Sequence, residues 1–142
     1  MTTTSPGHTP MTIFVDTSAF LAILDADEDN HAAAKELWQQ LVSQDAPLAC
    51  TNYILVETFA LAQRRLGMGA ARTLQEDLLP VVVVDWVDAY GHGSGVSAFL
   101  IAGRRDLSLV DCVSFDAMRR LDIETAFAFD RHFAEQGFST IP

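Results

Sequence analysis

Short apolar runs alternate with longer segments of helical periodicity along most of the chain. The apolar runs predict strands at 13–15, 48–50, 81–84 and 126–129, with a last edge strand at 138–141. Apolar residues between these runs recur every three or four positions, which predicts helices at about 17–24, 31–44, 52–66, 67–78, 86–103 and 109–121, and a short helical turn after Asp130. Strands that alternate with helices indicate an α/β domain whose parallel sheet carries helices on both faces.

Several of the predicted helices have recognisable ends. Asp29 or Asn30 can cap the helix at 31–44, and Thr51 or Asn52 can cap the next helix, which stops at Gly67. Ser108 can cap the helix that runs to about residue 121. The helix at 86–103 has the weakest pattern, because glycines at 91, 93 and 95 lower helix propensity in its first half.

The overall composition is that of one domain with an apolar core. The chain has 142 residues, of which 49% are hydrophobic. Residues 1–10 are polar and predict a disordered leader, so the folded domain is expected at 11–142. No apolar run is long enough for a membrane helix and no secretory signal opens the chain, so the expected location is cytoplasmic. Cys50 and Cys112 are far apart in sequence, and we expect buried free thiols.

The charge balance argues against a protein that binds nucleic acid by neutralising phosphates. The formal net charge is −10, whereas such proteins are usually basic. The positive charge is nevertheless concentrated, because eight of the nine basic residues are arginines and six of these form adjacent pairs. One pair, Arg104 and Arg105, lies just before the helix that Ser108 caps. These two residues are candidates for phosphate contacts, and plain surface charge is an equal alternative.

Four acidic residues stand out by their positions. Asp16 and Asp130 come directly after predicted strands, and in parallel sheets functional sites lie beyond the carboxyl ends of the strands. Glu57 lies on the apolar stripe of its helix, three residues after Ile54. Asp111 shares a helix face with apolar residues four and seven positions later. Carboxylates that face a core need a proton, a partner or a metal ion.

Each of these acids also has a purely structural explanation. Asp16 and Asp130 could cap helices, and Glu57 could form a structural ion pair. Asp111 lies three residues after Ser108, in the arrangement of a capping box. Taken together, however, four carboxylates at one sheet edge repel one another unless cations lie between them. Oxygen ligands of this kind suit Mg²⁺ or Mn²⁺.

Four segments resemble the motifs of a known family. They are IFVDTSAFLAIL (13–24), TNYILVE (51–57), LSLVDCVSFDAM (107–118) and AFAFDRHF (126–133). In this order they resemble the motifs of PIN-domain nucleases, most of all the VapC toxins of toxin–antitoxin pairs. The resemblance runs from about Ile13 to Ile141. It implies that Asp16, Glu57, Asp111 and Asp130 are the active-site acids, with Thr17, Ser18 and Ser108 as supporting hydroxyl residues.

The resemblance also implies an activity and partners. The family cuts RNA with Mg²⁺ or Mn²⁺, usually forms dimers, and is inhibited by a small cognate antitoxin. Asp16 and Asp111 are then the best candidates for direct metal ligands, and Glu57 and Asp130 complete the site. The antitoxin is expected to present a basic segment to so acidic a chain. Apolar residues on the helices at 31–44 and 53–66 suggest a homodimer surface: Leu37, Trp38, Leu41, Phe59 and Leu66.

Two other functions fit parts of the sequence. A haloacid dehalogenase-like phosphatase also has an aspartate after its first strand, but its second aspartate, two positions later, is replaced here by Ser18. Lys35, the only lysine, is not a clear catalytic residue. A catalytically silent interaction module with the same fold is the other alternative. The presence of all four acids argues against that alternative, and a metal titration would decide it.

Overall fold

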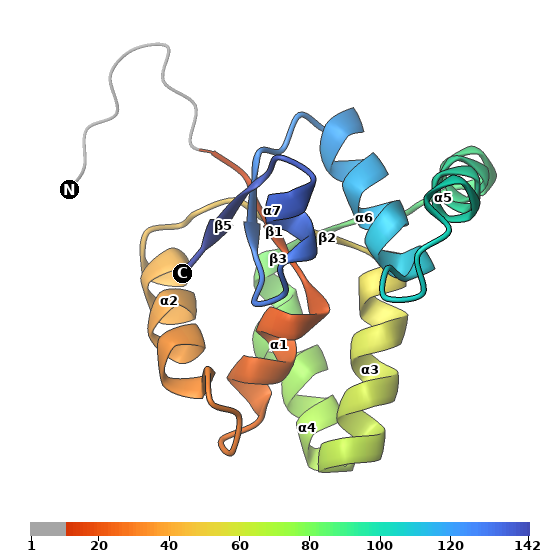
Figure 1. The fold of residues 1–142 in the computed structure, drawn as a ribbon. Helices are drawn as coiled ribbons and strands as arrows, with labels where there is room; N and C mark the ends of the chain where they lie inside the picture. The colour runs from red at the N-terminus through yellow and green to blue at the C-terminus, as the bar shows by residue number, and fades with distance from the viewer. Residues whose placement is uncertain (1–10) are drawn as a thin grey trace, which may run out of the picture.

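The computed structural model describes residues 11–142, whose five strands form one parallel sheet (Figure 1). The strands are β1 (Ile13–Val15), β2 (Leu48–Thr51), β3 (Val82–Asp85), β4 (Thr125–Phe127) and β5 (Ser139–Ile141). Their order in the sheet is β3-β2-β1-β4-β5, and every neighbouring pair is parallel. The α/β fold with a parallel sheet, predicted from the sequence, is therefore confirmed. The leader predicted at 1–10 lies outside the described residues.

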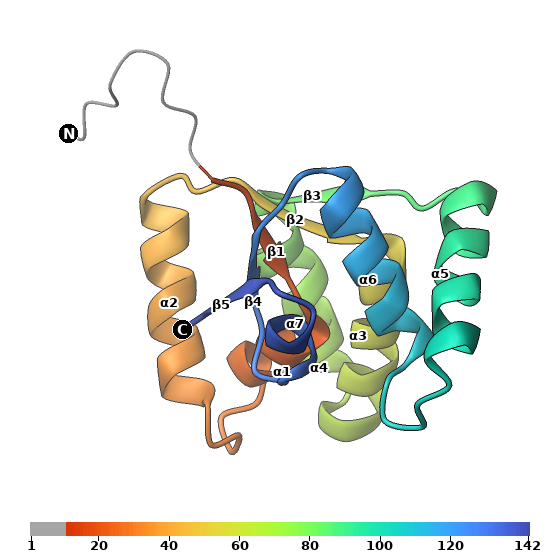
Figure 2. The same cartoon turned by 45° about the horizontal axis from the view of Figure 1, so that its top comes forward.

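Helices connect the strands. They are α1 (Thr17–Leu24), α2 (His31–Ser43), α3 (Asn52–Leu66), α4 (Met68–Thr73), α5 (Ala89–Ala102), α6 (Leu109–Arg120) and α7 (His132–Glu135), with a π-helical turn at Leu74–Leu78 and a 3₁₀ turn at Leu79–Val81. In both views α2 lies on one side of the sheet and α5 and α6 lie on the other (Figures 1 and 2). Within residues 11–142, no helix is long and apolar enough to cross a bilayer.

The strand connections that follow β1 and β4 run toward opposite edges of the sheet. The connection after β1 leads to β2 on one side, while the connection after β4 leads to β5 on the other side. Adjacent strands whose connections diverge leave a crevice at their carboxyl ends, which is the usual ligand position in open α/β sheets. Asp16 follows β1 at this crevice, and its backbone N–H donates to the carbonyl of Phe127, the last residue of β4, over 3.0 Å.

The core fills both faces of the sheet. Phe14, Val15 and Phe127 from the central strands are almost completely buried, as are Phe20 of α1 and Phe133 of α7. A strand that is covered on both faces has no polar side to show, which explains the uninterrupted apolar runs in the sequence. Cys50 and Cys112 are buried free thiols, as predicted.

Some local predictions need correction. Strand β4 ends at Phe127 and not at residue 129, so Asp130 comes three residues after the strand and not directly after it. Asn30 is the N-terminal cap residue of α2, but its side chain makes no capping hydrogen bond. Asp116 lies three and four residues before Arg119 and Arg120, a spacing that favours an ion pair within the helix, but it accepts a hydrogen bond from Ser94 of α5 instead. Thr51, by contrast, caps α3 as predicted, and α3 ends before Gly67.

The apolar residues expected at a dimer surface are largely used within one chain. Trp38 and Leu41 are buried in the core, and Leu37, Phe59 and Leu66 are partly buried. Five of the six most exposed large apolar side chains of the described residues lie on β3, on α5 and between them: Val83, Trp86, Tyr90, Leu100 and Ile101. The residues of α2 and α3 that suggested a dimer surface therefore no longer support a homodimer. The homodimer stays a prediction, and light scattering on the purified chain would decide it.

The glycine-rich segment of α5 allows this helix to pack closely on α6. A Cβ atom on Gly95 would lie 2.5 Å from Cγ2 of Val113 and 3.4 Å from its Cα. The first distance is shorter than real contacts of a Cβ atom, so a side chain would push the two helices apart. A Cβ atom on Gly93, in the same helix, would meet no other atom within 4 Å.

We therefore predict opposite effects for two similar substitutions in α5. Gly95→Ala should lower the free energy of unfolding by about 1–3 kcal/mol, because Val113 cannot move without disturbing the helix contact. Gly93→Ala should raise it by about 1 kcal/mol, because alanine favours the helix and meets open space. Urea unfolding of both variants measures the difference. Equal effects of the two substitutions would contradict this account of the helix contact.

Candidate active site

Three of the four predicted acids meet at the crevice between β1 and β4. Carboxylate oxygens of Asp16, Asp111 and Asp130 all lie within 4.8 Å of one another. Asp16 follows β1, Asp111 lies in the first turn of α6, and Asp130 lies in the loop between β4 and α7. The three residues are separated by as many as 114 positions in the sequence, so only the packing of these elements brings them together.

Asp16 is held by the helix that follows it. It is the N-cap of α1, and its carboxylate Oδ2 accepts hydrogen bonds from the backbone N–H of Ser18 at 3.2 Å and from the Ser18 hydroxyl at 2.6 Å. The structural explanation, a helix cap, is therefore correct for this residue. The same bonds fix the direction in which the carboxylate faces its two neighbours, so the capping role and the site role are compatible.

The two hydroxyl residues after Asp16 connect α1 to other elements. The Ser18 Oγ also accepts a hydrogen bond from the backbone N–H of Phe129 at 3.0 Å, which ties α1 to the loop that carries Asp130. The Thr17 hydroxyl is buried and accepts a hydrogen bond from the Thr58 hydroxyl of α3 at 3.0 Å. Sequence reasoning misses Thr58, because nothing in its local pattern sets it apart from other helical threonines.

Asp111 and Asp130 are held by similar local bonds. Ser108 and Asp111 form the predicted capping box: the Ser108 hydroxyl accepts from the Asp111 N–H at 3.0 Å, and the Asp111 carboxylate accepts from the Ser108 N–H at 3.2 Å. Asp130 accepts a hydrogen bond from the backbone N–H of His132 at 2.8 Å. Each acid thus accepts its local hydrogen bonds at one oxygen atom only, which leaves its other oxygen for a ligand.

Glu57 lies at the edge of this cluster and not within it. It is half-buried on α3 and is not among the three residues whose oxygens lie within 4.8 Å of one another. Burial raises the pKa of its carboxyl group, the Thr17 hydroxyl opposes this effect, and the charges of Asp111 and Asp130 add to it. None of the ion pairs formed by residues 11–142 includes Glu57, so the structural ion pair considered from the sequence is not present there.

The crowding of negative charge changes the protonation of the site. Burial raises the pKa of Asp16 from 3.8 to about 7; the hydrogen bonds from Ser18 oppose this shift, and the charges of Asp130 and Asp111 add to it. Burial also raises the pKa of Asp111. At neutral pH the cluster therefore either keeps a proton or needs a cation.

The donor set fits a hard divalent cation. The three side chains offer only carboxylate oxygens, which are the ligands that Mg²⁺ and Mn²⁺ prefer. Within the described part of the chain, no lysine or arginine forms an ion pair with Asp16, Asp111 or Asp130. A bound cation would compensate a negative charge that the protein itself leaves without a counter-charge.

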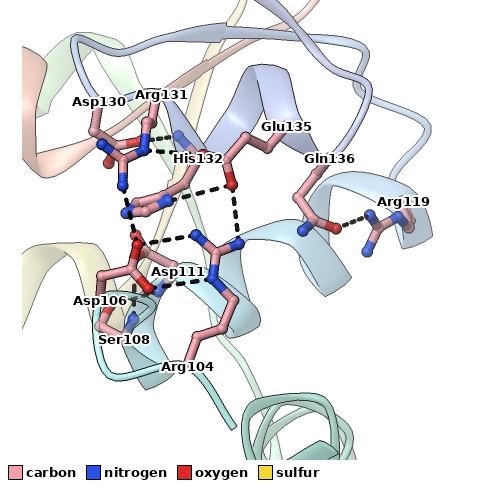
Figure 3. A network of polar contacts seen from close by, with 10 residues as sticks. All are labelled: Arg104, Asp106, Ser108, Asp111, Arg119, Asp130, Arg131, His132, Glu135 and Gln136. Carbon is pink, nitrogen blue, oxygen red and sulfur yellow. Dashed lines mark hydrogen bonds and ion pairs between the residues drawn. The ribbon is translucent and has the colours of Figure 1, made fainter. Parts of the chain in front are cut away.

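An ion-pair network lies beside the cluster and joins two of its loops (Figure 3). Arg104 donates to Asp106 and Glu135, each at 2.9 Å, and Arg131 contacts the same two acids at 3.2 and 3.0 Å. These bonds join the loop before α6 to α7, and thus the segments that carry Asp111 and Asp130. Arg104, a predicted phosphate contact, is therefore already bound to two carboxylates. Arg105 is exposed.

His132 is closer to the site than its sequence position indicates. The sequence favours a surface or capping role for it, but only 12% of its side chain is exposed. Its Nδ1 atom lies 3.8 Å from Glu135 and has no hydrogen-bond partner among the described residues. Figure 3 shows the ring within the ion-pair network, in contact with Glu135. Its position within the family-like segment 126–133 is the only signal in the sequence.

Comparison with known proteins agrees with the predicted resemblance. The family model described as the PIN domain matches residues 13–139. The 23S rRNA-specific endonuclease VapC20 of Mycobacterium tuberculosis is 36% identical over 127 residues, which cover 89% of this chain and 95% of the relative.

Solved structures show the same fold. The crystal structure of Mycobacterium tuberculosis VapC20, described as a Sarcin-Ricin loop cleaving toxin, matches with a TM-score of 0.79 and 35% identity over 89% of this chain and 95% of that one. FitAcB from Neisseria gonorrhoeae matches with a TM-score of 0.66 at 14% identity, over 92% of this chain and 96% of that one. VapBC2 from Rickettsia felis, bound to a DNA fragment from its promoter, matches with a TM-score of 0.67 at 11% identity, over 92% and 97%. At such low identity the last two show the fold alone.

The raised pKa of Asp16 predicts a specific pH dependence of stability. Between its ordinary value of 3.8 and about 7, the folded chain keeps a proton that the unfolded chain has released. Stability of the metal-free chain should therefore fall as the pH rises through this range and level off above it. From pH 5 to pH 8 the contribution of Asp16 is about 3 kcal/mol.

Asp16→Asn removes this contribution, because asparagine does not titrate. Urea unfolding in chelator at pH 5 and pH 8 should show a smaller loss of stability for the variant than for the unchanged chain. The comparison of the two slopes cancels the effect of titrating groups that do not interact with Asp16. Identical slopes would mean that Asp16 is ionised in the folded chain at pH 5.

Proposed function

The chain belongs to the PIN domain family, and we propose that it is a metal-dependent endoribonuclease that acts as the toxin of a toxin–antitoxin pair. One observation carries the proposal: three carboxylates without counter-charges meet within 4.8 Å at the crevice where the strand connections diverge. VapC20, a relative that covers nearly the whole chain, is an rRNA-specific endonuclease. Both observations support hydrolysis of an RNA phosphodiester bond as the reaction.

Asp16 and Asp111 are the proposed direct ligands of Mg²⁺ or Mn²⁺, and Glu57 and Asp130 complete the site from its two sides. A divalent ion supplies two things in such a site: a bound water of lowered pKa and a positive charge beside the scissile phosphate. The chain's own residues provide the geometry. Ser18 and Ser108 orient the carboxylates of Asp16 and Asp111, and Thr17 positions α1 against α3 beside Glu57.

The acidic net charge does not exclude an RNA substrate, because the relevant charge is local. Cations held by the carboxylates offset much of the negative charge where the phosphate binds. Arg105, which is exposed and lies six residues before Asp111 in the chain, is the simpler candidate for a phosphate contact. Arg104 could contribute only from within its ion-pair network, where its charge is shared with Asp106 and Glu135.

The first functional prediction concerns Asp16 and the metal together. Asp16→Asn should lower RNA cleavage by at least about 100-fold, because the amide keeps the shape of the side chain but loses the charge that holds the cation. Chelation should abolish cleavage by the unchanged chain, and either Mg²⁺ or Mn²⁺ should restore it. Gel analysis of RNA after incubation with each protein measures both effects.

Asp29→Asn is the matched control, since Asp29 is exposed in the acidic loop after α1. It makes the same chemical change at a distance from the cluster and should leave cleavage unchanged. Full activity of the Asp16 variant, or undiminished cleavage in excess chelator, would overturn the proposal. A folded, metal-binding chain that cuts no RNA would favour the silent interaction module.

The proposed inhibitor is a cognate antitoxin with a basic segment. The acid cluster and the net charge of −10 both attract a cationic partner. Arginine is the expected contact, because its planar guanidinium group binds carboxylates through two hydrogen bonds and stays charged when it is desolvated.

This partner predicts a salt-sensitive association. Changing the arginines of the antitoxin's basic segment to alanine should weaken both affinity and inhibition, and changing them to lysine should restore only part, because the two-point contact is lost. Association should also slow as salt rises. Calorimetry and a cleavage assay on the same variants measure the two effects. Unchanged inhibition by the alanine variants would mean that the antitoxin binds away from the acids.

A further inference from the structure

A pocket of about 420 Å³ adjoins the acid cluster on the side of α3 and α6. It is lined by Asn52, Tyr53, Val56, Glu57 and Val110. Two of these residues connect it directly to the site, because Glu57 is one of the proposed catalytic acids and Val110 precedes Asp111. The volume lies within the range of small-ligand pockets, and the family resemblance assigns a role only to Glu57 among these five residues.

The aromatic wall of the pocket is fixed by a contact between two helices. A hydrogen bond joins the Tyr53 hydroxyl of α3 to Nδ1 of His92 in α5, and the two ring centroids are 5.9 Å apart at an interplanar angle of 37°. Asn52 is also fixed, because its side-chain oxygen accepts a hydrogen bond from the backbone N–H of Val87 at 2.8 Å. The rings and the amide are thus held in place before any ligand binds.

The remaining wall is apolar and open. Val56 is 71% exposed although it lies next to Glu57 in the chain, and Val110 faces the same pocket. Apart from the Glu57 carboxylate on the side of the acid cluster, the lining consists of an aromatic ring, aliphatic side chains and one amide group. Such a lining is typical of sites that bind a nucleobase, which stacks on the ring and receives a hydrogen bond at its edge. A phosphate would find no cationic group in this lining.

We propose that this pocket binds one unpaired nucleobase of the RNA, in the nucleotide next to the scissile phosphate. Tyr53 provides the stacking surface, His92 fixes its orientation, and Val56 and Val110 cover the edges of the base. The inference rests on the proposed ribonuclease function and names the residues that would hold the base beside the cut.

Two larger pockets near the start of α5 fit this role less well. One measures about 540 Å³ and is lined by residues of α5 that include Tyr90. The other measures about 500 Å³ and lies between the start of α5 and the end of α6, where its lining includes Tyr90, Asp116 and Arg120. The acid cluster lies at the opposite end of α6, so a base in that pocket could not belong to the nucleotide that is cut. Arg120 there is already paired with Asp85. Tyr90 therefore serves as a matched control for Tyr53.

The test measures binding of a fluorescein-labelled, single-stranded RNA oligonucleotide by anisotropy, with Asp16→Asn as the background so that the RNA stays intact. Tyr53→Leu should weaken binding by roughly tenfold or more, the usual effect of losing one stacked base. Tyr53→Phe should keep most of the affinity, because the ring remains. Tyr90→Leu should change nothing.

A second set of oligonucleotides places one abasic nucleotide at each position in turn. At one position, the abasic RNA should bind with equal affinity to the Tyr53→Leu protein and to the Asp16→Asn protein that keeps Tyr53. The reason is that the base on which Tyr53 stacks is already missing. Val56→Gln, a change of an exposed side chain that should leave the fold intact, should weaken binding with the same positional signature. This variant keeps the test valid if Tyr53→Leu does not fold.

The outcomes separate the two proposals. RNA that is cleaved by the unchanged chain but bound equally by the Tyr53→Leu, Val56→Gln and Tyr90→Leu variants would overturn the base pocket and leave the ribonuclease function in place. A loss of affinity without any position-specific abasic effect would also overturn it. If the unchanged chain neither cleaves nor binds RNA, both proposals are overturned.

Discussion

The repulsion between three carboxylates is the constraint around which this site is built. Oxygen atoms of Asp16, Asp111 and Asp130 lie within 4.8 Å of one another, and burial with crowding raises the pKa of Asp16 to about 7. The protein tolerates this arrangement because each acid also accepts a local hydrogen bond, from Ser18, Ser108 or the backbone of His132. A carboxylate that accepts these local hydrogen bonds at one oxygen can therefore offer its other oxygen to a cation.

The parallel sheet brings the three acids together from three separate elements. Asp16 follows β1, Asp130 follows β4, and α6 returns Asp111 to the same crevice. Ser18 links two of these elements by a pair of hydrogen bonds, and the ion pairs of Arg104 and Arg131 link the loops that carry Asp111 and Asp130. Positions of the acids thus depend on contacts outside the cluster, which hold the site together whether or not a cation is bound.

Two different surfaces beside the cluster would contact different parts of the proposed substrate. The acid side suits a cation and a phosphate, while the pocket at Tyr53 and Val56 suits an uncharged base. This division resolves the conflict between an RNA substrate and a net charge of −10, because affinity for a base does not depend on basic residues. The larger polar pocket at the far end of α6 takes no part in this arrangement.

The sequence by itself determined the α/β class, the parallel sheet and most helix ends, and it proposed four acids as candidates for one site, because hydrophobic period, capping residues and family motifs are local signals. It placed the end of β4 two residues too late and treated His132 as a surface residue. Only the tertiary structure decided that three acids meet while Glu57 stays at the edge, that Thr58 supports Thr17, and that Tyr53 and His92 form one wall. These contacts join helices and loops distant in the chain, and their distances depend on how those elements pack.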